Sequence, residues 1–155
     1  MANTYTQIHI HCIFAIQNRL SLITKEWREE LYKYITGIVK NNGHKPLAIG
    51  GMPDHVHLLF GMRPVQALSD LMQSIKSDSS EWINKNNFVM GRFSWQEGYG
   101  AFSYSKSQLD SVIKYIEAQE QHHSKKSFVD EYRDFLKKFD VIFDDRYIFK
   151  PVAIK

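Results

Sequence analysis

Pro53-Asp54-His55-Val56-His57-Leu58-Leu59-Phe60 is the stretch around which the rest of the chain is organised. As a β-strand, it would point successive side chains to opposite faces of a sheet. His55 and His57 then lie side by side on one face, while the alternate apolar side chains face a core on the other. Neutral imidazole is a common ligand of transition-metal ions. The stretch therefore predicts a rigid strand that presents two nitrogen ligands to one ion.

The spacing of these two histidines does not by itself establish a metal site. Histidines on a half-polar strand face can also be solvated or hydrogen-bonded. In addition, His9-Ile10-His11 has the same spacing, so that two strands offer equivalent pairs. Evidence from other residues is needed to identify which of the two histidine pairs binds a metal ion.

The composition indicates one globular domain that spans residues 1–155. Hydrophobic residues make up 43% of the chain and aromatic residues 14%, which suits a packed core and argues against disorder. No apolar run approaches the roughly 20 residues that span a bilayer, and the N-terminus lacks the pattern of a signal peptide. The single cysteine, Cys12, cannot form an internal disulfide. We therefore expect a cytoplasmic protein with no membrane partner, whose net charge of +3 permits a polyanionic partner without requiring one.

The order of strand and helix patterns predicts the fold class. Strand patterns and apolar stripes at helical spacing alternate as β-α-β-β-α-β, followed by two further helices. This order is typical of an α+β protein with a ferredoxin-like antiparallel sheet, helices on one face, and the first and third strands at its centre. The strands are expected at 6–16, 46–51, 53–60 and 93–104, and the helices at 24–42, 64–82, 107–123 and 127–139.

The helix predicted over 107–123 carries Tyr115 and Gln119, which are four residues apart and therefore on one side. That side is the shoulder of the apolar stripe, so both residues can border the sheet while their polar ends reach a cleft. From the residues alone, Tyr115 can also be explained as a boundary tyrosine with a satisfied hydroxyl group.

The chain resembles the HUH single-tyrosine transposases, an insertion-sequence group that acts on single-stranded DNA and is related to the REP-associated tyrosine transposases. HUH denotes His-hydrophobic-His, which here is His55-Val56-His57. The nucleophile motif of the family, a tyrosine followed four residues later by a glutamine, corresponds to Tyr115-Ile116-Glu117-Ala118-Gln119. His9 and His11 do not match the metal motif, so the resemblance selects the second pair. Further matching stretches lie at 95–103, 119–123, 127–128 and 145–147, so that the likeness covers nearly the whole chain.

The resemblance implies transesterification on a DNA phosphodiester. The Tyr115 hydroxyl would attack the scissile phosphate, leaving a 5′-phosphotyrosine on the enzyme and a free 3′-hydroxyl on the other DNA fragment. The covalent link conserves the reactivity of the bond, so rejoining needs no nucleoside triphosphate, and the chain contains no P-loop motif. A tyrosine with a pKa of about 10 is a weak nucleophile at neutral pH, and the sequence identifies no general base for it.

A divalent metal ion, Mg²⁺ or Mn²⁺, is the cofactor that the resemblance implies. It would polarise a non-bridging oxygen of the phosphate. His55, His57 and the side-chain oxygen of Gln119 would bind it, with open positions for water and phosphate. Two imidazoles favour Mn²⁺ over Mg²⁺, which prefers oxygen ligands. His122, three residues after Gln119 on the same side of the helix, is the alternative third ligand.

The implied substrate is single-stranded DNA next to imperfect hairpins. Such DNA is bound by basic grooves and aromatic surfaces. Family members of this size are homodimers in which the tyrosine helix serves the histidine pair of the partner, so the resemblance implies active sites shared between subunits. The candidate DNA-binding cations, each of which can also be an ordinary surface residue, are Arg19, Lys76, Arg92, Lys106 and Lys114.

Two other functions remain open from the sequence. A domesticated relative would bind hairpin DNA without cleaving it, although the complete set of His55, His57, Tyr115 and Gln119 argues against this reading. A metal-dependent phosphodiesterase would use water as the nucleophile and leave Tyr115 structural. A covalent protein–DNA adduct that depends on Tyr115 distinguishes the three functions.

Overall fold

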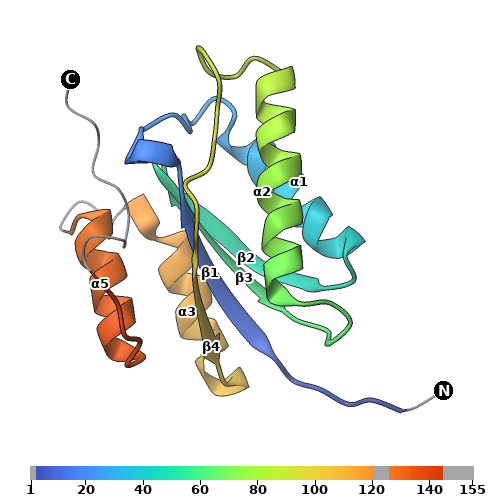
Figure 1. The fold of residues 1–155 in the computed structure, drawn as a ribbon. Coiled ribbons are helices and arrows are strands. Elements are labelled where there is room, and N and C mark those ends of the chain that lie inside the picture. Colours follow the sequence, from blue (N-terminus) through green and yellow to red (C-terminus); the bar gives the residue numbers. More distant parts are fainter. Residues whose placement is uncertain (1–2, 121–125, 145–155) are drawn as a thin grey trace.

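The computed structural model of this chain describes residues 3–120 and 126–144, which form one antiparallel sheet with helices on both of its faces (Figure 1). The strand order is β2-β3-β1-β4. The predicted α+β class and the ferredoxin-like βαββαβ order are confirmed, with β1 and β3 as the central pair. The elements are β1 (His9–Ala15), the 3-10 helix η1 (Gln17–Arg19), α1 (Arg28–Asn41), β2 (Lys45–Met52), β3 (His55–Gly61), α2 (Leu68–Lys85), β4 (Gly100–Tyr104), the 3-10 helix η2 (Lys106–Gln108), α3 (Leu109–Glu117) and α5 (Phe128–Lys138).

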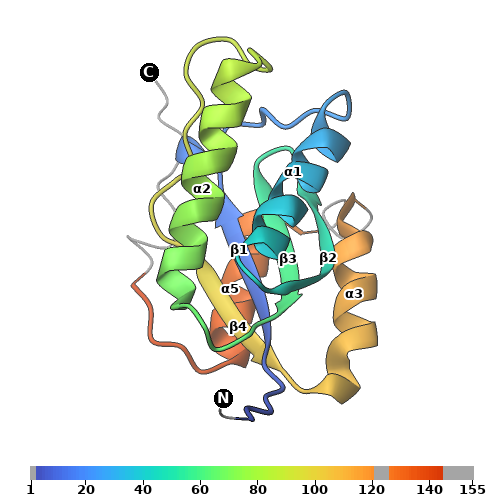
Figure 2. The same cartoon turned by 90° about the vertical axis from the view of Figure 1, so that its right-hand side faces the viewer.

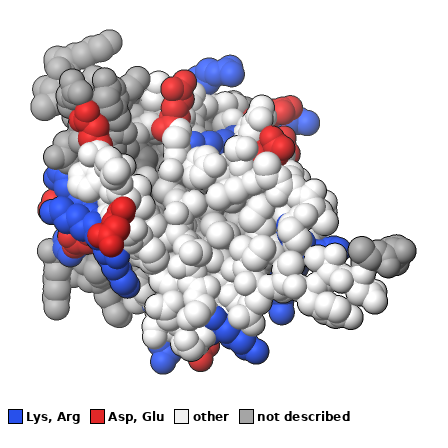
Figure 3. Space-filling view, turned by 60° about the horizontal axis from the view of Figure 1, so that its bottom comes forward, with Lys and Arg blue, Asp and Glu red and all other residues white. Residues whose placement is uncertain are grey.

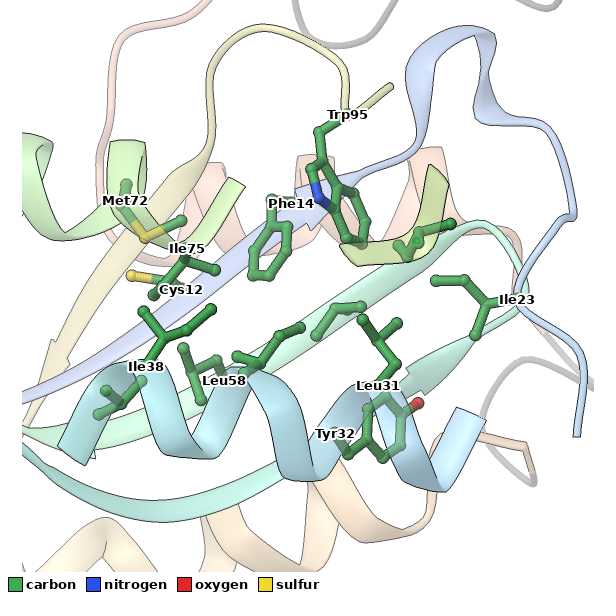
Figure 4. Close-up of a cluster of buried hydrophobic side chains, with 14 of the residues drawn as sticks. Cys12, Phe14, Ile23, Leu31, Tyr32, Ile38, Leu58, Met72, Ile75 and Trp95 are labelled. Atoms are coloured by element: carbon green, nitrogen blue, oxygen red, sulfur yellow. The ribbon is translucent and has the colours of Figure 1, made fainter. Parts of the chain in front are cut away.

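Helices α1 and α2 cover one face of the sheet (Figures 1 and 2). The alternation of side chains sends Cys12 and Phe14 of β1, and Val56, Leu58 and Phe60 of β3, toward these helices. There they pack with the apolar stripes of both helices in the main hydrophobic core (Figure 4). This core determines which way β3 faces. His55 and His57 alternate with the core residues of β3, so they must point to the opposite face of the sheet.

Helices α3 and α5 cover the opposite face of the sheet (Figure 1). There α5 packs against β1 and β4, and α3 packs mainly against β2. The register of the central pair sets Ile13 opposite His57 and Ala15 opposite His55. His55 contacts Phe128 of α5, and His57 lies against Tyr115 of α3. The histidine pair is therefore fully buried beneath both C-terminal helices.

The helices follow the sequence-based expectations except at some of their ends. Helix α2 begins at Leu68 rather than near residue 64, because Ala67 is still extended. Helix α3 ends at Glu117, where Ala118 leaves helical backbone angles, and the predicted continuation to residue 123 lies partly outside the described residues. Helix α5 begins after Ser127, whose side chain accepts a hydrogen bond from a backbone N–H of its first turn. In the described part of the chain, none of the helices is both long and apolar enough to cross a membrane.

Candidate active site

His55 lies at the first residue of β3, and both of its ring nitrogens have partners. Its Nδ1 lies 2.7 Å from Oδ1 of Asp54, and its ring stacks on Phe128 with 4.0 Å between ring centroids. Because a carboxylate accepts the Nδ1 proton, the neutral ring keeps a lone pair on Nε2. That Nε2 faces the side chain of Gln119, whose Oε1 lies 3.2 Å away.

His57 is oriented by a histidine of the first strand. Its Nδ1 lies 2.8 Å from Nε2 of His11, and the two rings are stacked with 5.0 Å between centroids. The strand register explains the contact, because Ile13 is directly opposite His57 and His11 is the next residue on that face of β1. Burial lowers the pKa of His11 to about 3, so His11 is neutral and its Nε2 can accept a proton from His57. His11 therefore belongs to the site, although its spacing alone does not distinguish it from a metal ligand.

Glu131 of α5 also belongs to this site, and like His11 it was not among the site residues predicted from the sequence. Its side chain is only 2% exposed. Its Oε1 lies 3.0 Å from Nε2 of His57 and 3.6 Å from Nε2 of His55. Its Oε2 accepts a hydrogen bond from the hydroxyl of Tyr115 and another, of 3.3 Å, from the amide nitrogen of Gln119. One buried carboxylate thus contacts both histidines, the tyrosine and the glutamine.

The sequence contains a signal that could have identified Glu131. It lies three residues after Phe128 and four before Phe135, and so within the apolar stripe predicted for the last helix. A charged residue in an apolar stripe is rarely buried without a polar site to contact. Burial, and to a lesser extent the negative charges of Asp54 and Asp134, raise the pKa of Glu131 to about 8.

Tyr115 and Gln119 lie at the histidine pair of their own chain. The ring of Tyr115 meets the ring of His57 edge-on, with 5.8 Å between centroids. Gln119 is 2% exposed, and its side chain reaches His55 although α3 ends two residues before it. The structure therefore brings His55, His57, Tyr115 and Gln119 together within one chain. His122, the alternative third ligand, lies outside the described residues.

The donor atoms at this site fit a small divalent cation. His55, His57 and Glu131 each offer one ligand atom, and these three atoms lie within 4.8 Å of one another. All three side chains are buried. Neighbouring ligands of a six-coordinate ion with metal–ligand distances of about 2.1 Å are about 3 Å apart. The separations of 3.0 and 3.6 Å from Glu131 to the histidines, and of 3.2 Å from His55 to Gln119, are close to that value. Mixed nitrogen and oxygen donors suit Mn²⁺, and the oxygens also suit Mg²⁺.

The five candidate DNA-binding cations have different surroundings. Arg92, Lys106 and Lys114 are exposed, and Arg19 is half-buried. Lys76 is half-buried as well, donates to two backbone carbonyl groups, and has a pKa lowered to about 8 by burial. Figure 3 shows one face of the molecule, on which Lys and Arg side chains lie around the edge, mixed with Asp and Glu.

A groove of about 980 Å³ has Gln119 among its lining residues. Its walls are α1 and the end of α3, and its floor includes part of β2. The guanidinium of Arg28 donates to Glu120 across the groove, with 2.9 Å between the atoms. The basic side chains that line it are Arg28, Lys33, Lys40 and Lys114, and the acidic ones are Glu29, Glu117 and Glu120.

Comparison with known proteins identifies the family of this chain. Residues 4–119, well over half of the chain, match the family model described as IS200-like transposase. The chain belongs to the IS200-like transposase family. The ISDra2 transposase TnpA of Deinococcus radiodurans is 27% identical to this transposase over 118 residues, which cover 73% of this chain and 84% of the relative. The resemblance noted from the two motifs is therefore confirmed.

Two solved structures share the fold of this transposase. A candidate transposase from Deinococcus radiodurans R1 superposes with a TM-score of 0.62 and 24% identity, over 77% of this chain and 95% of that one. A REP-associated tyrosine transposase bound to a REP hairpin superposes with a TM-score of 0.60 and 13% identity, over 99% of this chain and 93% of that one. Because both sequence identities are below 25%, the similarity to these two structures establishes only the fold.

Proposed function

We propose that this transposase cleaves and rejoins single-stranded DNA through a covalent 5′-phosphotyrosine at Tyr115, and that residues 1–155 act as one transposase domain. The observation that supports this function most is the convergence of a tyrosine hydroxyl, a buried carboxylate and two oriented histidines in one chain. The function also agrees with the family to which the chain belongs.

In the proposed cleavage step, the hydroxyl oxygen of Tyr115 attacks the scissile phosphorus. The bond from phosphorus to the 3′ oxygen breaks, so the 5′ phosphate becomes bonded to Tyr115 and the other fragment leaves as a 3′-hydroxyl after taking up a proton. The proton of the tyrosine has an acceptor in place, because the hydroxyl donates to Oε2 of Glu131. Rejoining is the reverse attack by a 3′-hydroxyl on the phosphotyrosine.

His55, His57 and Gln119 would hold the divalent cation, Mg²⁺ or Mn²⁺, that this family resemblance implies. When bound, the cation supplies positive charge that polarises a non-bridging oxygen of the phosphate. Asp54 orients the ring of His55, and His11 orients the ring of His57. Partners of this kind set the tautomer and direction of a ligand histidine before the ion arrives.

The proposed substrate is single-stranded DNA next to a hairpin. The groove that Gln119 helps to line supports this proposal, because Lys33, Lys40 and Lys114 line it as well. Cations along a groove bind the phosphates of a strand without regard to its sequence. The REP hairpin in one of the structural relatives is consistent with a hairpin next to the cleaved strand.

We also propose that each active site is completed within one chain, since Tyr115 lies against His57 of its own chain. A homodimer in which the tyrosine helix serves the partner, as the family resemblance implies, is the alternative.

The function is tested with end-labelled single-stranded DNA that carries the hairpins flanking the gene, incubated with Mn²⁺. We expect a protein–DNA adduct that survives denaturing electrophoresis and is lost with EDTA or in Tyr115→Phe. Tyr34→Phe is the matched control, because Tyr34 lies on α1 and stacks on Trp82 away from the site. Cleavage without an adduct would indicate a hydrolase, and binding without cleavage would indicate a hairpin-binding protein.

A further inference from the structure

We infer that Glu131 is a ligand of the divalent cation, and that its carboxylate joins the cation to the attacking tyrosine. This inference rests on the proposed function and adds to it a residue that belongs to neither the His-hydrophobic-His motif nor the tyrosine–glutamine motif.

The first observation is the direction of the lone pairs at His55 and Gln119. Asp54 accepts the Nδ1 proton of His55, so Nε2 is an acceptor when that ring is neutral. The amide nitrogen of Gln119 donates to Oε2 of Glu131, so the amide oxygen is turned toward His55 at 3.2 Å. Two acceptors at this distance repel each other unless a positive centre lies between them.

The second observation is that Oε1 of Glu131 joins the same group of acceptors. It lies 3.6 Å from Nε2 of His55 and 3.0 Å from Nε2 of His57. When His57 donates its Nδ1 proton to His11, its Nε2 is also an acceptor. Acceptor atoms of His55, His57 and Glu131 then lie within 4.8 Å of one another, and the amide oxygen of Gln119 lies 3.2 Å from Nε2 of His55. A single divalent cation would be held by these acceptors.

The third observation is that the two carboxylate oxygens of Glu131 contact different groups. Oε1 faces the histidines, whereas Oε2 receives the hydroxyl of Tyr115 and the amide of Gln119. A carboxylate is also the only anionic donor of the set and a hard oxygen ligand, which Mg²⁺ and Mn²⁺ prefer over imidazole. The same side chain can therefore bind the cation and hold the nucleophile beside it.

The fourth observation is that the helix carrying Glu131 is anchored on both sides of this residue. Ser127 caps the start of α5, and Phe128 stacks on the ring of His55. Tyr132 and Leu136 pack in the apolar cluster over β1 and β4. A ligand on an anchored helix is positioned before the ion binds, which lowers the entropic cost of binding.

The test measures Mn²⁺ binding to the full chain by titration calorimetry, without DNA. We expect Glu131→Gln to weaken the Mn²⁺ affinity at least about tenfold. Even the loss of a residue that only hydrogen-bonds to a metal ligand typically lowers metal affinity by about 10–100-fold. Glu131→Asp, which keeps the charge, should retain part of the affinity. The matched control is Asp130→Asn, which removes the same charge from the exposed neighbouring position of α5 and should leave the affinity unchanged.

A second measurement is the visible absorption of bound Co²⁺, which reports the ligand set directly. We expect its band positions to shift in Glu131→Gln and to stay unchanged in Asp130→Asn. Wild-type Mn²⁺ affinity and an unchanged Co²⁺ spectrum in Glu131→Gln would overturn the inference, even if that variant no longer forms the adduct. The proposed function would fail separately, if His57→Ala also bound Mn²⁺ like the wild type or if Tyr115→Phe still formed the adduct.

Discussion

Nε2 of His11 lies 2.8 Å from Nδ1 of His57, so a histidine of β1 orients a histidine of β3. The two His-x-His stretches of the chain therefore meet at one site, where His11 of the first stretch supports His57 of the second, a proposed metal ligand. His11 is enclosed by the rings of Phe102, Tyr104 and Phe135, which leave it little freedom to turn away.

Replacing His11 should weaken the metal site without removing a ligand. His11→Phe keeps an aromatic ring in an aromatic environment but cannot accept the Nδ1 proton of His57. We expect titration calorimetry to show that the Mn²⁺ affinity falls about tenfold, as is typical when a residue that hydrogen-bonds to a metal-binding histidine is replaced. His9→Phe, at the other position of the same stretch, should leave the affinity unchanged, and an equal loss in both variants would contradict an orienting role specific to His11.

Gly50 of β2 is expected to be essential for the placement of Tyr115. A Cβ at this position would collide with the backbone carbonyl oxygen of Ile116, so α3 packs on β2 only where glycine is present. Gly50→Ala should displace α3, lower the free energy of unfolding by about 1–3 kcal/mol, and reduce adduct formation. Urea unfolding and the adduct assay measure the two effects.

Gly37 provides the control for this substitution. It lies inside α1, and a Cβ there would have no atom within 4 Å. Gly37→Ala should therefore raise the free energy of unfolding by roughly 0.5–1 kcal/mol, because alanine favours a helix more than glycine does. Equal destabilisation by both alanines would show that close packing of α3 is not the cause.

A mixing experiment decides whether the active site is made by one chain or two. Tyr115→Phe lacks the proposed nucleophile, and His57→Ala lacks one of the proposed metal ligands. Because Tyr115 contacts the histidine pair of its own chain, we expect a mixture of the two variants to form no adduct. Recovery of adduct in the mixture would show that the tyrosine helix serves the partner subunit, as the family resemblance implies.

The basic side chains of the groove should contribute to DNA affinity through phosphates. Lys33 and Lys40 are exposed on the face of α1 that lines the groove. Lys33→Gln with Lys40→Gln should weaken single-stranded DNA binding and lower the slope of log affinity against log salt by about 0.7 for each phosphate that is no longer neutralised. Lys85→Gln, at the end of α2 and outside the groove lining, should leave the slope unchanged. Fluorescence anisotropy at several salt concentrations measures this slope.

The thiol of Cys12 should be unreactive in the folded protein. Cys12 is fully buried, and burial raises the pKa of its thiol to about 12. The thiolate is the reactive form, so almost none is present at pH 8. We expect Ellman's reagent to react with Cys12 only after addition of guanidinium, and prompt reaction of the native protein would contradict the packing of β1.

The fold class and the residues of both family motifs could be predicted from the amino-acid sequence alone. Alternating side chains in 53–60 placed His55 and His57 on one face, because a strand that buries Val56, Leu58 and Phe60 must turn its other residues away from that core. The order of strands and helices determined the sheet, because connections of these lengths allow few arrangements. These features depend on residues close together in the chain.

Which other residues reach the histidines depends on how strands and helices that are distant in the sequence pack together. His11 and His57 are 46 positions apart, and His57 and Glu131 are 74 positions apart. The first contact depends on the register of β1 against β3, and the second depends on how α5 lies across the sheet. Periodicity within one element specifies which face a side chain occupies, but it does not specify what lies opposite that face. For this reason the position of Glu131 in an apolar stripe could mark it as unusual from the sequence, but its contacts with both histidines depend on how α5 packs on the sheet.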